Sequence, residues 1–483
     1  MSRYDLVIKN GTLVVPYTGV FAADIGVKDG RVATISSSIA ASEGEQALDA
    51  SGKFVFPGAV DSHFHIGIYR PLSEDARSES ASALVGGVTT LLSYFRTGHH
   101  YLNKSGPYRE IFPEVLELSD GHFCTDYGYH IAVMTAEQLD EVPMLVEQFG
   151  VGSFKFYMFY KGLTLQADST QGRDYTMAEN YDLGHLYRLM EQVSAMAHKH
   201  RRQGRISLSL HCENPELIRV FIEEVKAKRL EGLEAYSQAR PPLTERLSIH
   251  EAVILADAAN CPINLLHLSG QMALQAGIDV RRQYPHLGIQ LEVTLHHLML
   301  SCDRVGGLIG KVNPPIRTQQ DAAFLWQGID SGEVDTVVSD HACCFEEEKG
   351  PDLWTALPGF GGSSLLYPVL ISEGYHKRNL SLTRIAELAS ANPARSFALY
   401  PRKGTIRVGG DADFAIIDPH KVHTVTPELL QSAEDFTPFA GIRLTGWPTQ
   451  TILRGQLLYT DGQIVARPGV GQFIKRPVEL HRE

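Results

Sequence analysis

Residues 54–67 read F-V-F-P-G-A-V-D-S-H-F-H-I-G, an apolar run that ends in two histidines separated by one residue. Side chains two positions apart lie on the same face of a β-strand. A strand through this stretch therefore points His63 and His65 to one side and Phe64 to the other. Asp61 falls on the histidine side, and we expect it to orient one of the imidazoles.

After this strand the chain alternates short apolar runs with helical stretches, a pattern typical of parallel α/β folds. The candidate strands are V-T-T-L-L-S-Y (88–94), Y-G-Y-H-I-A-V (127–133), G-S-F-K-F-Y-M (152–158), I-S-L-S-L-H (206–211), I-N-L-L-H-L (263–268), G-I-Q-L-E-V-T (288–294) and T-V-V-S-D-H (336–341). Together with the strand before Asp61 they give eight strand–helix units, the number in a (β/α)8 TIM barrel. We predict such a barrel over residues 57–402.

The two ends of the chain have a different character. Residues 1–56 and 403–475 read as short alternating strands joined by turns such as K-D-G at 28–30. We expect both ends to pair into one small accessory β-sandwich domain, followed by a tail over 476–483. Stretches 97–120 and 161–183 predict long loops over the active face, in which S-T-Q-G-R-D-Y (169–175) forms a wall.

Composition excludes several classes of protein. The 483 residues are 43% apolar and 21% charged, as in ordinary globular proteins, and the formal net charge of −12 argues against nucleic-acid and anionic-membrane partners. The chain has no apolar run long enough to predict a transmembrane helix, and its start lacks the apolar core of a signal peptide. The six cysteines show no C-x-x-C spacing, so we expect a cytoplasmic protein in which Cys343 and Cys344 pack near the pocket.

Polar side chains stand where the predicted strands end. In chain order they are His63, His65, Lys155, His211, His267 and Asp340. Each alone has a plain explanation, such as a hydrogen-bonded core histidine or an aspartate that caps a helix. Together they match a two-metal site, because imidazole and carboxylate suit divalent ions, and a buried, deprotonated lysine can react with carbon dioxide to give a bridging carbamate. Such a site suits the hydrolysis of an amide.

These stretches resemble the amidohydrolase superfamily, in its branch of dihydropyrimidinases, hydantoinases, allantoinases and dihydroorotases. The resemblance rests on D-S-H-F-H (61–65), G-S-F-K-F-Y-M-F-Y-K-G (152–162), L-H-C-E-N (210–214), L-L-H-L-S-G (265–270), E-V-T-L-H-H-L (292–298), K-V-N-P-P-I-R (311–317) and S-D-H-A (339–342). It continues through residues 391–413 and runs nearly from end to end. This ordered set of motifs is highly specific.

The resemblance implies two divalent metal ions per subunit, with zinc expected. His63 and His65 would hold the more buried ion, and His211 and His267 the second, bridged by Lys155 as N6-carboxylysine. Asp340 would ligate the first ion and act as general base, taking the proton of a metal-bridging hydroxide during attack and passing it to the departing nitrogen.

The same resemblance assigns substrate contacts. Tyr160 would steady the developing oxyanion, although a tyrosine at the barrel rim is the plain alternative. Asn313 would hold the cyclic amide, unless it only makes a turn before proline. The backbone of Pro358 and Gly359 would also contact the substrate. The family commonly forms homotetramers, so we expect a homo-oligomer.

One glycine bears on the substrate. Dihydroorotases carry an arginine two residues after the second histidine, where this chain has Gly67. Dihydroorotate is therefore disfavoured, although 292–298 and 311–317 resemble that branch, whereas 436–455 resembles the dihydropyrimidinases and hydantoinases. Arg70 and Arg96 are the candidates for binding an anionic substrate.

We therefore predict a binuclear hydrolase that opens a dihydropyrimidine, a hydantoin or a related imide, a small-molecule partner. The alternatives are an allantoinase, a linear amide hydrolase on the same site, and a non-catalytic scaffold. The scaffold is disfavoured because all six ligand positions are filled.

Overall fold

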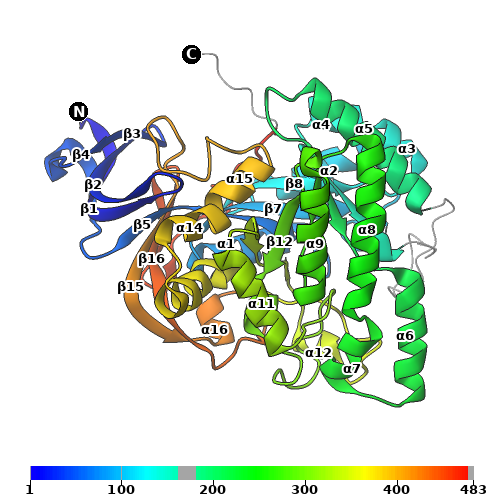
Figure 1. Ribbon diagram of the computed structural model, residues 1–483. Helices are drawn as coiled ribbons and strands as arrows, with labels where there is room; N and C mark the ends of the chain where they lie inside the picture. Colours follow the sequence, from blue (N-terminus) through cyan, green and yellow to red (C-terminus); the bar gives the residue numbers. More distant parts are fainter. Residues whose placement is uncertain (1, 99, 161–180, 477–483) are drawn as a thin grey trace.

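The computed structural model describes residues 2–98, 100–160 and 181–476. The predicted wall at 169–175 lies outside the described residues, as does nearly all of the predicted loop over 161–183 and of the tail after Arg476. In Figure 1 a barrel with its surrounding helices stands beside a sheet that contains both the blue N-terminal and the orange C-terminal strands.

Parallel strands form the barrel, as predicted. They are β6 (Ala59–His65), β7 (Val88–Arg96), β8 (Asp126–Ala132), β9 (Ser153–Tyr157), β10 (Ser207–His211), β11 (Ile263–Leu265), β12 (Gln290–Thr294), β13 (Thr336–Val338) and β14 (His341–Ala342). Each strand from β6 to β12 pairs in parallel with the next strand along the chain. All carboxyl ends therefore lie at one mouth of the barrel.

The last barrel strand is split, and the split closes the ring. Its first part, β13, pairs with β12, and its second part, β14, pairs with β6. Between the two parts lie Ser339 and Asp340, and Asp340 adopts a positive φ of 54°. The chain turns at Asp340 from one neighbouring strand to the other.

Helices cover the barrel. They are α1 (Leu72–Val85), α2 (Tyr108–Ser119), α3 (Ala136–Asp140), α4 (Val142–Glu147), α5 (Leu183–Lys199), α6 (Pro215–Ala227), α7 (Gly232–Ala239), α8 (Pro242–Ala259), α9 (Gln271–Gln283), α10 (Leu295–Met299), α11 (Gln319–Asp330), α12 (Glu346–Lys349), α13 (Leu366–Val369), α14 (Leu382–Ala386), α15 (Asn392–Ser396) and α16 (Pro427–Leu430). Short 3-10 turns span Ala41–Glu43, Met158–Tyr160, Pro285–Leu287 and Ser363–Leu365, and π-helical turns span Leu370–His376 and Glu387–Ala391.

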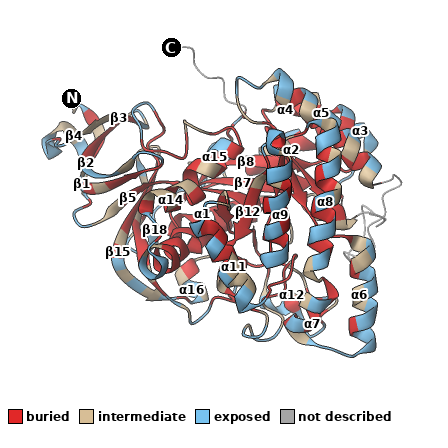
Figure 2. Ribbon diagram, in the orientation of Figure 1, coloured by how far each residue is buried: buried red, intermediate tan, exposed pale blue. Residues whose placement is uncertain are grey.

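Several helices have one buried face and a side-chain cap at their start. Figure 2 shows exposed and buried residues alternating along α8 and α9, as expected for helices with one face toward the barrel. The Asp182 side chain accepts from the amides of Gly184 and His185 and so fixes the start of α5. Within the described part of the chain, no helix has both the length and the apolar character to cross a membrane.

The two chain ends share one mixed sheet. Its strands are β1 (Tyr4–Val15), β2 (Gly19–Lys28), β3 (Arg31–Ser36), β4 (Gly44–Asp49), β5 (Phe54–Pro57), β15 (Phe414–Thr424), β16 (Arg443–Leu453), β17 (Gln456–Thr460) and β18 (Gln463–Ile464). The antiparallel pair β5–β15 joins the N-terminal strands to the C-terminal ones. The first half of β1 pairs with β4 and the second half with β5, and the β1–β2 register shifts between Ile8 and Gly11. The predicted union of the termini is confirmed, in a single continuous sheet with its own apolar core. The domain boundaries stay a prediction.

A buried ion-pair network joins this sheet to the barrel. The Lys403 ammonium is 1% exposed and lies 2.6 Å from Asp126 at the start of β8, 3.0 Å from Asp411 and 2.6 Å from Asp413 just before β15. The carboxylates raise the pKa of Lys403 although burial opposes its charge. The chain end contributes a second link, because the Tyr127 amide in β8 donates to the Gln472 carbonyl at 2.9 Å and the Ile474 amide donates to the Tyr127 carbonyl at 2.8 Å.

We predict that Lys403→Met lowers the free energy of unfolding by about 3–5 kcal/mol, because it leaves three buried carboxylates without their shared cation. Urea denaturation followed by circular dichroism measures the change. Lys377→Met, at a largely exposed lysine, serves as the control and is expected to change stability by less than about 1 kcal/mol. Equal stability of the two variants would contradict the assigned role.

Candidate functional site

His63, His65 and Asp340 converge at the carboxyl mouth of the barrel. His63 Nε2 lies 3.0 Å and His65 Nε2 3.3 Å from the same Asp340 oxygen, Oδ1. All three residues are buried, and their ligand atoms lie within 4.8 Å of one another. As alternation predicts, Phe64 points the other way and stacks on His341, with ring centroids 4.3 Å apart. The geometry is that of a three-ligand metal site.

Asp61 has a different role from the one expected. Within the described chain its carboxylate accepts hydrogen bonds from the Ser339 amide (3.1 Å), the Ser339 hydroxyl (2.5 Å) and the Ser363 hydroxyl (2.8 Å). Ser339 directly precedes Asp340, and within the described residues Asp61 makes no hydrogen bond to His63 or His65. The prediction that Asp61 orients an imidazole was therefore wrong, because β6 and the segment after β13 are neighbours in the closed ring. Asp61 anchors the residue that precedes Asp340.

The other two predicted histidines continue the cluster. The ring of His267, which follows β11, lies 5.3 Å from the ring of His63 and 4.2 Å from that of His211 at the end of β10. His267 adopts a positive φ of 36°, an uncommon conformation that is often found at functional sites. Four imidazoles thus form a continuous row across the barrel mouth.

Lys155 lies inside the barrel in the middle of β9. Its ammonium is fully buried between aromatic faces, 4.3 Å from the ring centroid of Tyr94 and 4.7 Å from that of Tyr157. Nζ has no hydrogen-bond partner among residues 2–98, 100–160 and 181–476. Burial lowers the pKa of Lys155 to about 7. The Tyr94 ring also contacts His63 at 4.6 Å, so the lysine and the histidine row share one wall.

The electrostatics fit a bound cation. Burial lowers the pKa of His65 and of His211 to about 4, so both imidazoles are neutral and keep a lone pair for a metal. Burial disfavours a charge on His63 too, but Asp340 and Glu292 outweigh it and raise the pKa of His63 to about 9. Neither ring nitrogen of His267 has a hydrogen-bond partner in the described chain. The two carboxylates thus stabilise positive charge at His63, and the unpaired nitrogens of His267 lie in the same row.

Three groups that orient the histidines were not predicted. Glu292 in β12 accepts from His63 Nδ1 at 2.7 Å, and Glu213 accepts from His211 Nε2 at 2.6 Å. Tyr101 OH lies 2.9 Å from His65 Nδ1. Each contact leaves the other ring nitrogen for a metal. Two features of the sequence could have indicated these groups. Glu292 is a carboxylate inside the apolar run of β12, and Glu213 follows His211 by two positions.

The predicted substrate contacts lie around this mouth. Asn313 Oδ1 accepts from Tyr236 OH at 2.5 Å. The Pro358 carbonyl accepts from Tyr69 OH at 2.7 Å, and the Gly359 amide donates to the Lys311 carbonyl at 2.9 Å. Tyr160 ends a 3-10 turn directly after β9, with its ring 5.1 Å from that of Tyr157.

The two arginines proposed for an anionic substrate are engaged within the protein. Arg70 Nη1 donates to Asp75 at 3.0 Å and to Ser78 at 3.2 Å, and lies 3.7 Å from Cys343 Sγ. Arg96 is buried between the rings of Tyr101 and Tyr160, 5.8 and 5.6 Å from their centroids. All six cysteines are free.

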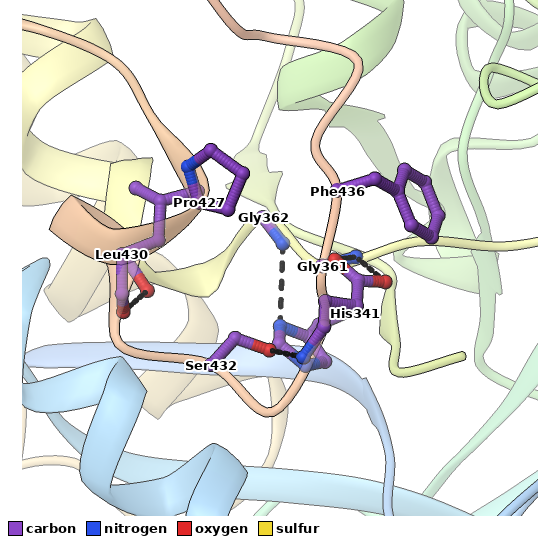
Figure 3. A pocket seen from close by; sticks show the side chains of 9 residues that line it. His341, Gly361, Gly362, Pro427, Leu430, Ser432 and Phe436 are labelled. Atoms are coloured by element: carbon purple, nitrogen blue, oxygen red, sulfur yellow. Dashed lines mark hydrogen bonds between the residues drawn. The ribbon is translucent and has the colours of Figure 1, made fainter. Parts of the chain in front are cut away.

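Two cavities lie elsewhere in the described chain, and no residue of the histidine row lines either of them. The smaller, of about 10 Å³, has room for roughly one water. Figure 3 shows it next to His341, whose ring accepts from the Gly362 amide at 3.2 Å. The larger, of about 770 Å³, opens between α6, α7 and residues 302–308 and 351–354. Its walls include Leu233 and Leu353, and Leu353 packs in one apolar cluster with Tyr236, which contacts Asn313.

The chain is similar to known proteins along nearly its whole length. Residues 317–458 match the profile of the Amidohydrolase family. The chain is 30% identical to an L-hydantoinase of Paenarthrobacter aurescens, covering 98% of both chains, and 29% identical to an allantoinase of Desulfitobacterium hafniense (strain Y51), covering 98% of this chain and 99% of the other. The solved L-hydantoinase (dihydropyrimidinase) of Arthrobacter aurescens is 29% identical, covers 98% of this chain and all of its own, and superposes with a TM-score of 0.86.

We predict that Glu292→Gln lowers the affinity for Zn²⁺ by about 10- to 100-fold, because it removes the charge that orients His63. Competition with a chromophoric chelator measures the affinity without any substrate. Glu333→Gln changes a surface carboxylate paired with two arginines and is the matched control. Unchanged Zn²⁺ affinity in the Glu292 variant would show that this carboxylate does not support a metal ligand.

Proposed function

The chain belongs to the amidohydrolase family and is a hydantoinase-like cyclic amidohydrolase, and from this premise we propose that it uses two divalent metal ions to open a neutral cyclic amide. The observation that carries the proposal is the convergence of four imidazoles and Asp340 at the barrel mouth, above a buried lysine without a partner in the described chain. A scaffold protein has no need for a set of buried, unpaired metal ligands.

We assign the ligands as follows. His63, His65 and Asp340 would hold one ion, His211 and His267 the second, and Lys155 would bridge the two as a carbamate (N6-carboxylysine). The burial of the Lys155 amine and its lack of a hydrogen-bond partner in the described chain support this assignment. Bound Zn²⁺ ions would polarise the amide carbonyl and lower the pKa of a water molecule.

Asp340 is the proposed proton carrier. Burial opposes its charge, but the two neighbouring imidazoles hold its pKa well below the ordinary range, so the carboxylate is ionised and can accept a proton. It would take the proton of the attacking water and deliver it to the ring nitrogen that departs. The split strand places this carboxylate at the contact with His63 and His65.

Substrate binding involves residues from several loops. The Tyr160 hydroxyl would donate to the amide oxygen as negative charge develops there. Asn313, held by Tyr236, would hydrogen-bond the ring amide, and the backbone at Pro358 and Gly359 would contact its other edge.

We infer an uncharged ring, namely a hydantoin, a dihydropyrimidine or a related imide. Gly67 replaces the arginine of dihydroorotases, and the Arg70 guanidinium is bound to Asp75. The 29% identity to an allantoinase makes allantoin, another neutral ring, the second candidate. Homotetramer formation and a cytoplasmic location stay predictions.

We predict that the Zn²⁺-loaded protein hydrolyses hydantoins or dihydrouracil with kcat/KM at least about 100-fold above that for dihydroorotate, because Gly67 stands where dihydroorotases have their arginine and Arg70 is bound to Asp75. A panel of dihydrouracil, substituted hydantoins, allantoin, dihydroorotate and succinimide, followed by loss of ring absorbance, ranks the substrates. Preference for dihydroorotate would refute the inference of a neutral ring, and inactivity on the whole panel would refute the proposed function.

We predict that Lys155→Ala reduces bound metal from about two ions per chain to one or fewer, because the bridging ligand is lost. Metal analysis by mass spectrometry measures the content, and added acetate or propionate is expected to restore part of it. Lys199→Ala, at an exposed lysine paired with Glu147, is the control. Full metal content in the Lys155 variant would rule out the carbamate bridge.

A further inference from the structure

Residues 356–360, here called the rim segment, form an irregular stretch whose carbonyls are all engaged. The carbonyls of Ala356, Leu357, Pro358 and Gly359 accept bonds from the side chains of Lys311, Lys349, Tyr69 and again Lys349. Phe360 O accepts from the Ala342 amide at 3.2 Å, two residues after Asp340. The segment therefore lies directly against the strand that carries Asp340.

Lys349, the last residue of α12, is the centre of these contacts. It is 2% exposed, and its ammonium donates to Leu357 O at 3.0 Å, to Lys311 O at 3.3 Å and to Gly359 O. No carboxylate lies within ion-pair distance of Lys349 in the ranges that the structure describes. Backbone carbonyls and the rings of Phe360 and Phe436, 5.7 and 5.5 Å away, contact its charge directly, and the carboxylates of Glu434 and Glu348 favour it from a longer distance.

Lys311 links the rim segment to Asn313. Its ammonium donates to Ala356 O and lies 5.0 Å from the ring centroid of Tyr236, which donates to Asn313. Its own carbonyl accepts from the Gly359 amide and from Lys349. The two lysines thus join both proposed substrate-contact stretches into one unit.

A structural role alone does not explain these two side chains. Burying an ammonium without a carboxylate is unfavourable, and an apolar side chain would fill the same space at lower cost. The side chains of Lys311, Lys349 and Tyr69, however, donate to separate carbonyls of the rim segment. These bonds fix the orientation of the successive peptide planes. In an irregular stretch no backbone ladder does this.

We propose that Lys349, together with Lys311, is a positioning residue that holds the rim segment in the orientation required to bind the substrate ring. This inference rests on the proposed function, because it takes Pro358 and Gly359 as substrate contacts. The metal ligands and Asp340 belong to other elements, so the lysines act on ring binding rather than on the reacting groups. Their removal weakens binding and leaves the turnover of bound substrate nearly intact.

Kinetics of Lys349→Met on the best ring of the substrate panel test the proposal. We expect KM to rise at least about 10-fold, kcat to change less than about threefold and metal content to stay at the wild-type value. Tyr69→Phe, which removes only the hydroxyl that binds the Pro358 carbonyl, is expected to raise KM by a smaller factor. Unchanged KM in both variants, or a fall in kcat at constant KM, would overturn the proposal.

Thr451→Val separates positioning from general destabilisation. Thr451 is buried and donates to the Leu84 carbonyl at 2.7 Å, so the variant loses a similar side-chain bond to a carbonyl remote from the site. Its KM should equal that of the wild type. A KM rise as large as that of Lys349→Met would assign the effect to stability and overturn the proposal. If Lys349→Met fails to fold, Lys311→Met and Tyr69→Phe decide by the same criterion.

Amide hydrogen exchange, measured without substrate, tests the positioning role of the two lysines independently of the proposed function. The amides of Leu357 and Gly359 donate to Glu348 O and Lys311 O, and we expect them to exchange at least about 10-fold faster in Lys349→Met. If the wild type hydrolyses no ring, the proposed function fails and exchange alone decides whether the lysines hold the segment. Unchanged exchange would show that they do not.

Discussion

The burial of Lys155 inside the barrel is the constraint on which the rest of the site depends. An ammonium between two aromatic faces, with no carboxylate at ion-pair distance in the described chain, is unfavourable unless its chemistry changes or another charge compensates it. Its neighbours also lack a full set of partners, since both nitrogens of His267 are unpaired in the described residues. Divalent ions bridged by a carbamate would resolve both problems at once.

The charges around the histidine row form two layers. Asp340 touches the imidazoles directly, whereas Glu292 and Glu213 hold their outer nitrogens, and Glu213 is in turn paired with the buried Arg240 at 2.9 Å. Each outer carboxylate fixes the orientation of one imidazole, that of His63 or that of His211, and leaves its other ring nitrogen for a metal ion. The two layers together hold these imidazoles in place within the row.

Much of the fold and part of the candidate site could be predicted from local sequence patterns. Alternation along single strands correctly indicated the barrel strands, the shared face of His63 and His65, and the outward turn of Phe64. What could not be predicted depends on residues distant in sequence. The contact of Asp61 with Ser339 exists only because the ring closes, and the pairing of Arg70 with Asp75 depends on how the start of α1 folds back. The Lys349 contacts with the rim segment have no periodic signature at all.

The split of the last strand at Asp340 gives the ring an unusual seam. Residue 340 meets residue 63 only after β14 has paired with β6, a contact between positions almost three hundred apart in the chain. Such distant contacts tend to form late in folding. A molecule whose seam is still open therefore lacks the contact that brings Asp340, the proposed proton carrier, to His63, whatever else has already folded. If Asp340 acts as proposed, a newly made chain gains its activity only when its barrel is complete.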